Sequence, residues 1–345
     1  MRPALLLVLI LTPGNLIHAA PLSDNSANDY KIQETWKLGG DGSWDYLTLD
    51  GPSHLLYIAR LNRVMVVNTV NGKLVAEIGK LEHAHGVALD TDGKTGFISD
   101  GGAAQVQVFD RSSYKITSAI PTGKNPDSLV IEPRSHRLFV FNGISKSATV
   151  IDIDSRTVVA TIPLPGKPEF SATGEGGNVF VNIEGNSQIV RIAAATLKVT
   201  AAWPLAPCEG PSGLAIDTAH HRLFSVCDNG KMAVVDSTSG KLVATVPIGE
   251  GPDAVAYDPV RAAIFSSNGE SGDLTIVQQV TPDRYDKVQT LPTKLGARTL
   301  ALDPDSGKLY TVSAKLGPKP TATAAVPKPK PAVLSDSFIA LVIGQ

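Results

Sequence analysis

A short motif that recurs seven times constrains the fold of this chain more than any other feature. Each copy is an apolar run bounded by polar residues: DYLTLD at Asp45, HGVALD at His85, DSLVIE at Asp127, EFSATG at Glu169, SGLAID at Ser212, DAVAYD at Asp253 and RTLALD at Arg298. The copies begin 40, 42, 42, 43, 41 and 45 residues apart. A nearly fixed period in this range is typical of repeat proteins, in which every repeat forms one supersecondary unit.

The rest of each repeat indicates four short strands. The third repeat contains SLVIE, RLFVFN, ATVIDI and TVVATIPL, separated by residues that favour turns. An aromatic residue follows each motif start at about the twelfth position: Tyr57, Phe97, Phe139, Phe180, Phe224, Phe265 and Tyr310. No segment shows sustained helical periodicity. We therefore predict an all-β, seven-bladed β-propeller with four-stranded antiparallel blades and very little helix.

The two ends of the chain indicate how the ring closes. The seventh repeat offers inner strands at 299–303 and 308–312 and a third strand at 338–343, where the sequence is nearly finished. The segment 30–38, YKIQETWKL, precedes the first repeat where an outer strand is expected. We predict that it completes the last blade, which removes edges that could pair with other chains. Small residues at the fourth motif position are expected where the blades converge on the axis.

The first residues read as an export signal. Residues 1–20 combine Arg2, an apolar run and Ala19 and Ala20 before Pro21, which is typical of a secretory signal peptide. We therefore expect a signal peptide at 1–20, a linker at 21–29 and one propeller domain at 30–345. The remainder has no run that is long and apolar enough for a membrane helix, so a periplasmic or secreted, monomeric protein is expected.

The repeats resemble a known family. Segments such as VVATIPLPGKPEF, KLVATVPIGEGPDAVAYD and RLFVFNG look like YVTN-type propeller repeats, and residues 30–345 are similar to the bacterial YncE-like family. The YVTN tetrapeptide itself is degenerate here, reading FVFN, FVNI, FSVC and FSSN. The resemblance implies an exported seven-bladed propeller, and nucleic-acid binding as one function. A net charge of −2 does not support that function, because phosphate binding needs a basic surface.

The seven motif starts are the main candidates for a binding site. In a propeller the loop before the first strand and the loop after the second share one face, so these residues should surround the mouth of the channel. The ligand-binding candidates are Asp45, His85, Asp127, Glu169, Ser212, Asp253 and Arg298, with Glu184, Asn142, Asn182 and Asn268 from the loops after the second strands. The alternative is that these residues only shape turns and pair with each other.

Two kinds of metal are compatible with this composition. Clustered carboxylates are hard oxygen ligands that suit calcium. His83 and His85 are spaced to lie on one side of an extended segment, and with Asp45 and Asp127 they could hold a transition metal. The hypothetical metal ligands are therefore Asp127, Glu169, His83 and His85. A loop histidine that serves only the local structure is the alternative.

Two further features stand at the same end of the repeats. Cys208 and Cys227 both fall at the start of the fifth repeat, so in an oxidising compartment they are expected to form a disulfide. Residues 314–335 form an insertion rich in Pro, Ala and Lys, which predicts an extended loop over the channel face. It is either a flap across the channel or a solvated linker.

The sequence therefore predicts a fold and a surface more firmly than a reaction. Common catalytic signatures such as GxSxG, the P-loop and HExxH are absent. The first functional hypothesis is a module that binds a small polar ligand or another exported protein. The second is a hydrolase or lyase assisted by a divalent metal, by analogy with lactonase-type propellers.

Overall fold

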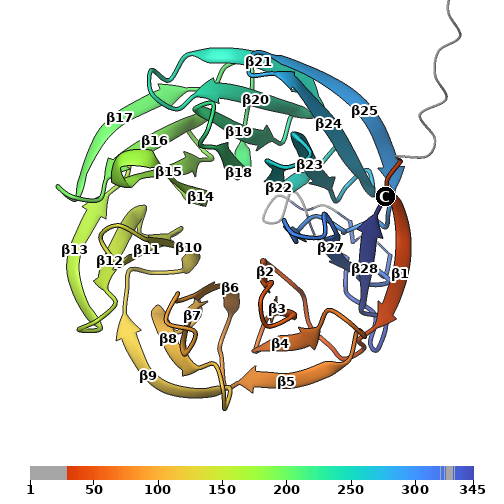
Figure 1. The fold of residues 1–345 in the computed structure, drawn as a ribbon. Helices are drawn as coiled ribbons and strands as arrows, with labels where there is room; N and C mark the ends of the chain where they lie inside the picture. Colours follow the sequence, from red (N-terminus) through yellow and green to blue (C-terminus); the bar gives the residue numbers. More distant parts are fainter. Residues whose placement is uncertain (1–28, 319, 322, 324–328, 330) are drawn as a thin grey trace, which may run out of the picture.

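The computed structural model describes residues 29–318, 320, 321, 323, 329 and 331–345, and these form a ring of seven β-sheets. Figure 1 shows the sheets arranged like blades around one axis. Each sheet has four antiparallel strands in sequential order, except that the last sheet has the order β1-β28-β27-β26. The predicted seven-bladed all-β propeller is therefore confirmed. The signal-peptide prediction for residues 1–20 lies outside the described residues.

The strands of the first four blades are short and regular. In chain order they are β2 Leu47–Asp50, β3 Leu55–Arg60, β4 Arg63–Asn68 and β5 Leu74–Gly79; β6 Ala84–Leu89, β7 Thr95–Asp100, β8 Gln105–Asp110 and β9 Lys115–Pro121; β10 Pro126–Glu132, β11 Arg137–Asn142, β12 Ser147–Asp152 and β13 Thr157–Pro163; β14 Pro168–Gly174, β15 Asn178–Ile183, β16 Gln188–Ala193 and β17 Lys198–Pro204.

The remaining three blades follow the same plan. Their strands are β18 Pro211–Asp217, β19 Arg222–Cys227, β20 Lys231–Asp236 and β21 Leu242–Pro247; β22 Pro252–Asp258, β23 Ala263–Asn268, β24 Asp273–Thr281 and β25 Arg284–Pro292; β26 Leu300–Leu302, β27 Leu309–Ser313 and β28 Ile339–Gly344, with β1 Lys31–Lys37 as the outer strand of blade 7. The only helical element among the described residues is a 3-10 turn at Glu175–Gly177.

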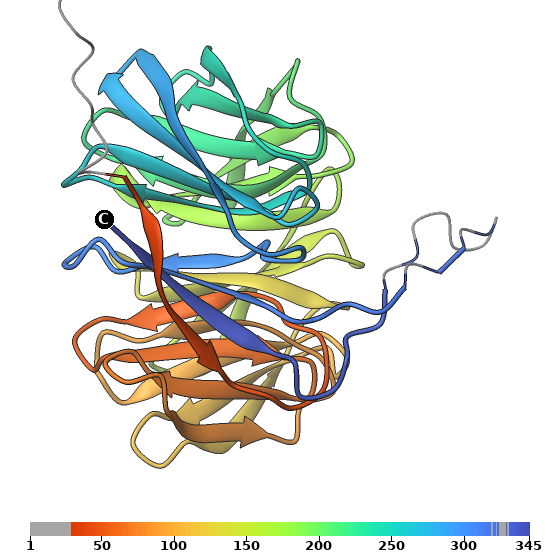
Figure 2. The ribbon, with the colours of Figure 1, turned by 90° about the vertical axis from the view of Figure 1, so that its right-hand side faces the viewer.

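Strand β1 closes the ring as predicted. It pairs antiparallel with β28 from Lys31 opposite Gly344 to Lys37 opposite Ile339. Figures 1 and 2 show this first strand lying along the outside of the last blade, beside the C-terminus. The final blade therefore combines both ends of the described chain, and β1 covers the edge of β28.

The recurring aromatic residues are the wedges between blades. Each one is at most 2% exposed, and each lies in a cluster with apolar residues of the following blade. Phe139 of β11, for example, packs with Val179 and Val181 of β15. Because burial of a large aromatic side chain stabilises by about 2 kcal/mol or more, seven such wedges explain why the ring holds together.

Cross-strand pairing explains why the residue at the fourth motif position is small. Each of these residues is the cross-strand partner of the aromatic wedge: Thr48 with Tyr57, Ala88 with Phe97, Val130 with Phe139, Ala172 with Phe180, Ala215 with Phe224, Ala256 with Phe265 and Ala301 with Tyr310. A small side chain opposite a large one leaves room for the ring.

Candidate functional site

The seven motif starts come together at one end of the axis, in a set of residues that we call the rim. In blades 2 to 6 each of them lies at a register shift between the first and second strands, such as the one between Pro126 and Leu129. A bulge of this kind bends the strand and re-aims a side chain. In four of these blades the first strand begins with a proline, a position where a residue without an N–H donor is tolerated.

Side-chain hydroxyls hold the rim backbone in place. Ser99 donates a hydrogen bond of 2.5 Å to the carbonyl oxygen of Asp127, and Ser128 donates one of 2.5 Å to that of Glu169. Ser267 donates to the carbonyl of Arg298 in the same way. Each bond joins one blade to the first strand of the next. The rim residues therefore project from a backbone that is fixed on both sides.

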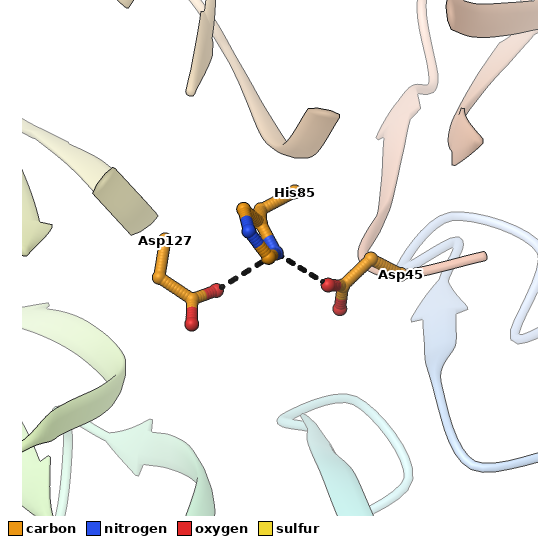
Figure 3. Close-up of side chains that lie close together, drawn as sticks. All are labelled: Asp45, His85 and Asp127. Atoms are coloured by element: carbon orange, nitrogen blue, oxygen red, sulfur yellow. Dashed lines mark hydrogen bonds and ion pairs between the residues drawn. The ribbon is translucent and has the colours of Figure 1, made fainter. Parts of the chain in front are cut away.

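His85 is held between two carboxylates, as Figure 3 shows. Its Nδ1 atom lies 2.7 Å from Asp45 Oδ2 and 3.6 Å from Asp127 Oδ1. Burial alone would lower the pKa of this imidazole, but the hydrogen bond to Asp45 and the charge of Asp127 raise it to about 9. His85 is therefore an imidazolium at neutral pH. Its Nε2 atom is buried and makes no regular hydrogen bond.

The same three residues form the one group among the described residues with the composition and spacing of a metal site. One potential ligand atom of each lies within 4.8 Å of the others. Of the four predicted metal ligands, only His85 and Asp127 belong to it, and Asp45 joins them. The ring of His83 stacks on that of His85 at 4.4 Å, and Glu169 contacts Lys167 instead.

Three further ion pairs lie beside this group. Lys167 Nζ contacts the Glu169 carboxylate and lies 2.7 Å from Glu184 Oε2. Arg298 Nε lies 2.9 Å from Asp253 Oδ2. Together with Asp45 and Asp127, these pairs bring five carboxyl groups close to three cationic side chains, His85, Lys167 and Arg298. Lys167 was not among the predicted site residues, because a lysine in a turn gives no signal of its own.

Two of these carboxyl groups, those of Glu169 and Asp127, have raised pKa values. Burial, followed by the charge of Asp127, raises the pKa of Glu169 from 4.5 to about 8, although Lys167 opposes the change. Burial and the charge of Asp45 raise the pKa of Asp127 from 3.8 to about 6. Carboxylates with raised pKa values indicate a place where added positive charge is favourable.

Two aromatic rings lie beneath the carboxylates. Tyr46 of blade 1 and Phe170 of blade 4 meet edge to face with their centroids 4.3 Å apart, although they come from blades on different sides of the ring. Burial raises the pKa of Tyr46 well above its usual range, and the charges of all four rim acids raise it further. The other five repeats have small residues at this position: Gly86, Ser128, Gly213, Ala254 and Thr299.

Below this aromatic pair the axis contains a small cavity. Its volume is about 160 Å³, and Tyr46 and Phe170 line it together with first-strand residues such as Thr48 and Ser128. The aromatic pair therefore lies next to the carboxylates and also lines this cavity.

Four of the predicted ligand-binding residues have structural roles instead. Asn142, Asn182 and Asn268 are fully buried, and their side-chain amides donate hydrogen bonds within the protein. Ser212 is 9% exposed and donates to the carbonyl of Pro252 in the next blade. We therefore leave these four out of the proposed site. Asn and Ser occupy similar places in turns and in sites, so their type alone could not separate the two roles.

Cys208 and Cys227 form a disulfide with a Cα–Cα distance of 5.7 Å. Both residues are fully buried at the rim end of blade 5. The bridge ties the loop that enters β18 to the end of β19. It therefore fixes the backbone next to the rim without contributing a ligand atom.

The insertion between β27 and β28 forms a narrow arm at its base. Leu316 pairs with Val333, and hydrogen bonds link Gly317 to Ala332 and Leu334 to Lys315. Figure 2 shows the described residues of this arm standing out from the propeller. The predicted flap, or alternatively solvated linker, includes residues 319, 322, 324–328 and 330, which lie outside the described residues.

Fold and site together define a seven-bladed β-propeller with a charged site on its axis. Comparison with known proteins is consistent with this class. The chain is 25% identical to the uncharacterized protein YncE of Salmonella typhi over 193 residues, or 54% of this chain and 53% of that protein. YncE of Salmonella typhimurium is 24% identical over 193 residues, which are again 54% of this chain and 53% of that protein. The match thus spans about half the length of these relatives, and over that part the chain is similar to YncE.

Solved structures support the fold alone. A chain of hydrazine synthase from Kuenenia stuttgartiensis has a TM-score of 0.70 and 17% identity, with 79% of this chain and 92% of that chain covered. A chain of the mitotic checkpoint complex has a TM-score of 0.69 and 14% identity, with 95% and 98% covered. No family model matches the sequence. Among the described residues no helix is long and apolar enough to cross a membrane.

Proposed function

We propose that this protein is a binding module that holds a small ligand carrying an ammonium group at the rim. The observation that carries the proposal is the cluster of carboxyl groups at the axis, where Asp45, Asp127, Glu169 and Asp253 lie together and where burial beside like charges raises the pKa values of Asp127 and Glu169. Carboxylates gathered beside low-dielectric walls attract a cation from solution. Solvent reaches the site, because the four side chains are 12 to 28% exposed.

The aromatic floor favours an organic ammonium ion. The faces of Tyr and Phe rings attract alkylammonium groups, and such contacts contribute about 0.5 to 2 kcal/mol. In this proposal Tyr46 and Phe170 contact the alkyl part of the ligand while the carboxylates accept hydrogen bonds from its nitrogen. A calcium ion prefers six or more oxygen ligands and gains little from an aromatic surface.

A divalent metal at Asp45, His85 and Asp127 is the second candidate, and the compact spacing of these three residues favours it. One imidazole and two carboxylates form a ligand set that suits a transition metal, and a metal held there could assist hydrolysis. The metal would have to displace the Nδ1 proton that both carboxylates stabilise. Metal analysis of the purified protein decides this candidate, since stoichiometric metal lost in Asp45→Asn would support it.

We also propose that the protein is exported to the periplasm or secreted. The buried disulfide supports this compartment, because disulfides persist in oxidising environments. Cleavage between residues 19 and 22 in the protein recovered from a bacterial periplasm would test it. A full-length N-terminus in the cytoplasm would contradict it.

Calorimetric titration with n-butylammonium tests the proposed ligand class. We expect one-to-one binding that weakens as salt is raised, because the attraction is electrostatic. The matched neutral probe is n-butanol, which has a hydroxyl in place of the ammonium group and should not bind. Equal binding of the two probes, or no binding of butylammonium at millimolar concentration, would contradict the proposal.

A further inference from the structure

A second pocket lies between blades 4 and 5, on the face opposite the rim. Its volume is about 240 Å³, larger than the 160 Å³ of the cavity on the axis. Its walls come from the turns between first and second strands and from the turn between β20 and β21, all of which lie at the end of the blades away from the rim. The proposed ammonium site and this pocket share no residue.

The turn between the first and second strands of blade 4 builds one wall of this pocket. The 3-10 turn Glu175–Gly177 separates β14 from β15, and Figure 1 shows it as the short coil beside β15. Gly176 and Gly177 have φ values of 71° and 75°, which favour glycine because other side chains are strained there. Glu175 and Gly176 line the pocket, and Glu175 Oε2 lies 3.9 Å from His221 Nδ1.

Arg191 supplies a positive charge without an acidic partner. Its Nε donates to Thr200 Oγ1 at 3.0 Å, and one terminal nitrogen donates to the Thr238 carbonyl at 3.3 Å. Its guanidinium lies 5.3 Å from the Trp203 ring, which stacks in turn on Phe180. Within the described part of the chain Arg191 makes no ion pair with a carboxylate. The guanidinium is thus held in place by neutral groups and can bind an anion through its N–H donors.

The remaining surface combines an apolar base with polar walls. The partly exposed Ile216 provides the apolar part in front of the buried Phe180, while Asn178 and the hydroxyl residues Thr218, Ser237 and Thr238 surround it. A sugar ring matches this arrangement, because its C–H groups form an apolar face and its hydroxyl groups lie around the edge. If such a ring carries a carboxylate, a guanidinium can bind it with two parallel hydrogen bonds.

We propose that this pocket binds a sugar acid, with the carboxylate of the ligand on Arg191 and its ring over Ile216. The site is independent of the rim. The two sites also select opposite charges, so the same molecule would present a cation site on one face and an anion site on the other.

Titration with D-glucuronate, followed by calorimetry and by amide chemical shifts, tests this proposal. Wild-type protein should bind glucuronate at least about tenfold more tightly than neutral D-glucose, a ratio equivalent to about 1.4 kcal/mol. Shifted amides should belong to blades 4 and 5. Comparable binding of the two sugars, no binding of glucuronate, or shifts confined to the rim would overturn the proposal.

Two variants locate the binding. Arg191→Gln should remove the preference for glucuronate, and Thr218→Trp, at an exposed position, should block entry to the pocket. The rim variant Asp127→Asn should bind glucuronate as wild type does. If Arg191→Gln fails to fold, Thr218→Trp decides alone, and glucuronate binding that survives Thr218→Trp would overturn the proposal.

Discussion

A protein with Asp127→Asn and Glu169→Gln should lose its affinity for butylammonium by at least about 100-fold, which corresponds to about 2.8 kcal/mol. Both side chains are largely buried at the rim, where water screens an ionised carboxylate poorly. In the double variant the remaining carboxylates of Asp45, Asp253 and Glu184 are already paired with His85, Arg298 and Lys167. The ligand ammonium has then lost the two carboxyl groups that are proposed to bind it.

The control for this measurement is Asp305→Asn, which makes the same chemical change at an exposed turn of blade 7. It should bind butylammonium as wild type does. Thermal unfolding of each variant confirms that it is folded. Unchanged affinity in the double variant would show that the ligand is held elsewhere.

Stability should fall as pH rises from about 4.5 to 8, and Glu169 should be a main cause. Its pKa is higher in the folded protein, at about 8, than the 4.5 that is usual for an exposed glutamate. The folded protein therefore binds more protons than the unfolded chain in this window, and the free energy of unfolding decreases with pH. The loss is on the order of 3 kcal/mol for a group perturbed to this extent.

Glu169→Gln should remove most of this dependence, because glutamine stays neutral in both states. The variant should then equal or exceed wild-type stability above pH 8, as measured by urea unfolding at several pH values. His85 contributes in the same direction, since its stabilising charge is present below pH 6.5 and lost as pH rises through about 9. A wild-type stability that rises between pH 5 and 8 would contradict the assigned protonation.

The fold could be predicted because each of the seven repeats shows the same succession of four short strands. The predicted strand 137–142 coincides with β11, and the predicted outer strand 30–38 differs from β1 by one residue at each end. A pattern repeated seven times averages out local ambiguity, so even blade 7, whose chain is split between the two ends, was assigned correctly. The disulfide was also predictable, from the position of two cysteines in one repeat.

The details of the site were less predictable, for physical reasons. The rim positions followed from the repeat, but which carboxylate contacts which cation depends on bulges and rotamers that have no sequence signature. Lys167 and the burial of Asn142 were missed for this reason. The aromatic floor did leave a signal, since Tyr46 and Phe170 stand where five other repeats have small residues.

The pocket between blades 4 and 5 arises from a departure from the repeat. The GEGGN segment that contains the 3-10 turn has no equivalent in the other blades, and an irregular segment is harder to interpret by comparison with its neighbours. Its glycines, however, are the residues that a left-handed backbone requires. Irregular positions in a regular protein are therefore worth separate attention when sites are sought.

A crystal structure of the protein grown with n-butylammonium tests the central claim most directly. Our account predicts an ordered ligand whose nitrogen lies within about 3.2 Å of the Asp127 or Glu169 carboxylate and whose alkyl chain contacts Tyr46 and Phe170. A ligand bound at another surface, or a rim that contains only water at saturating butylammonium, would contradict it.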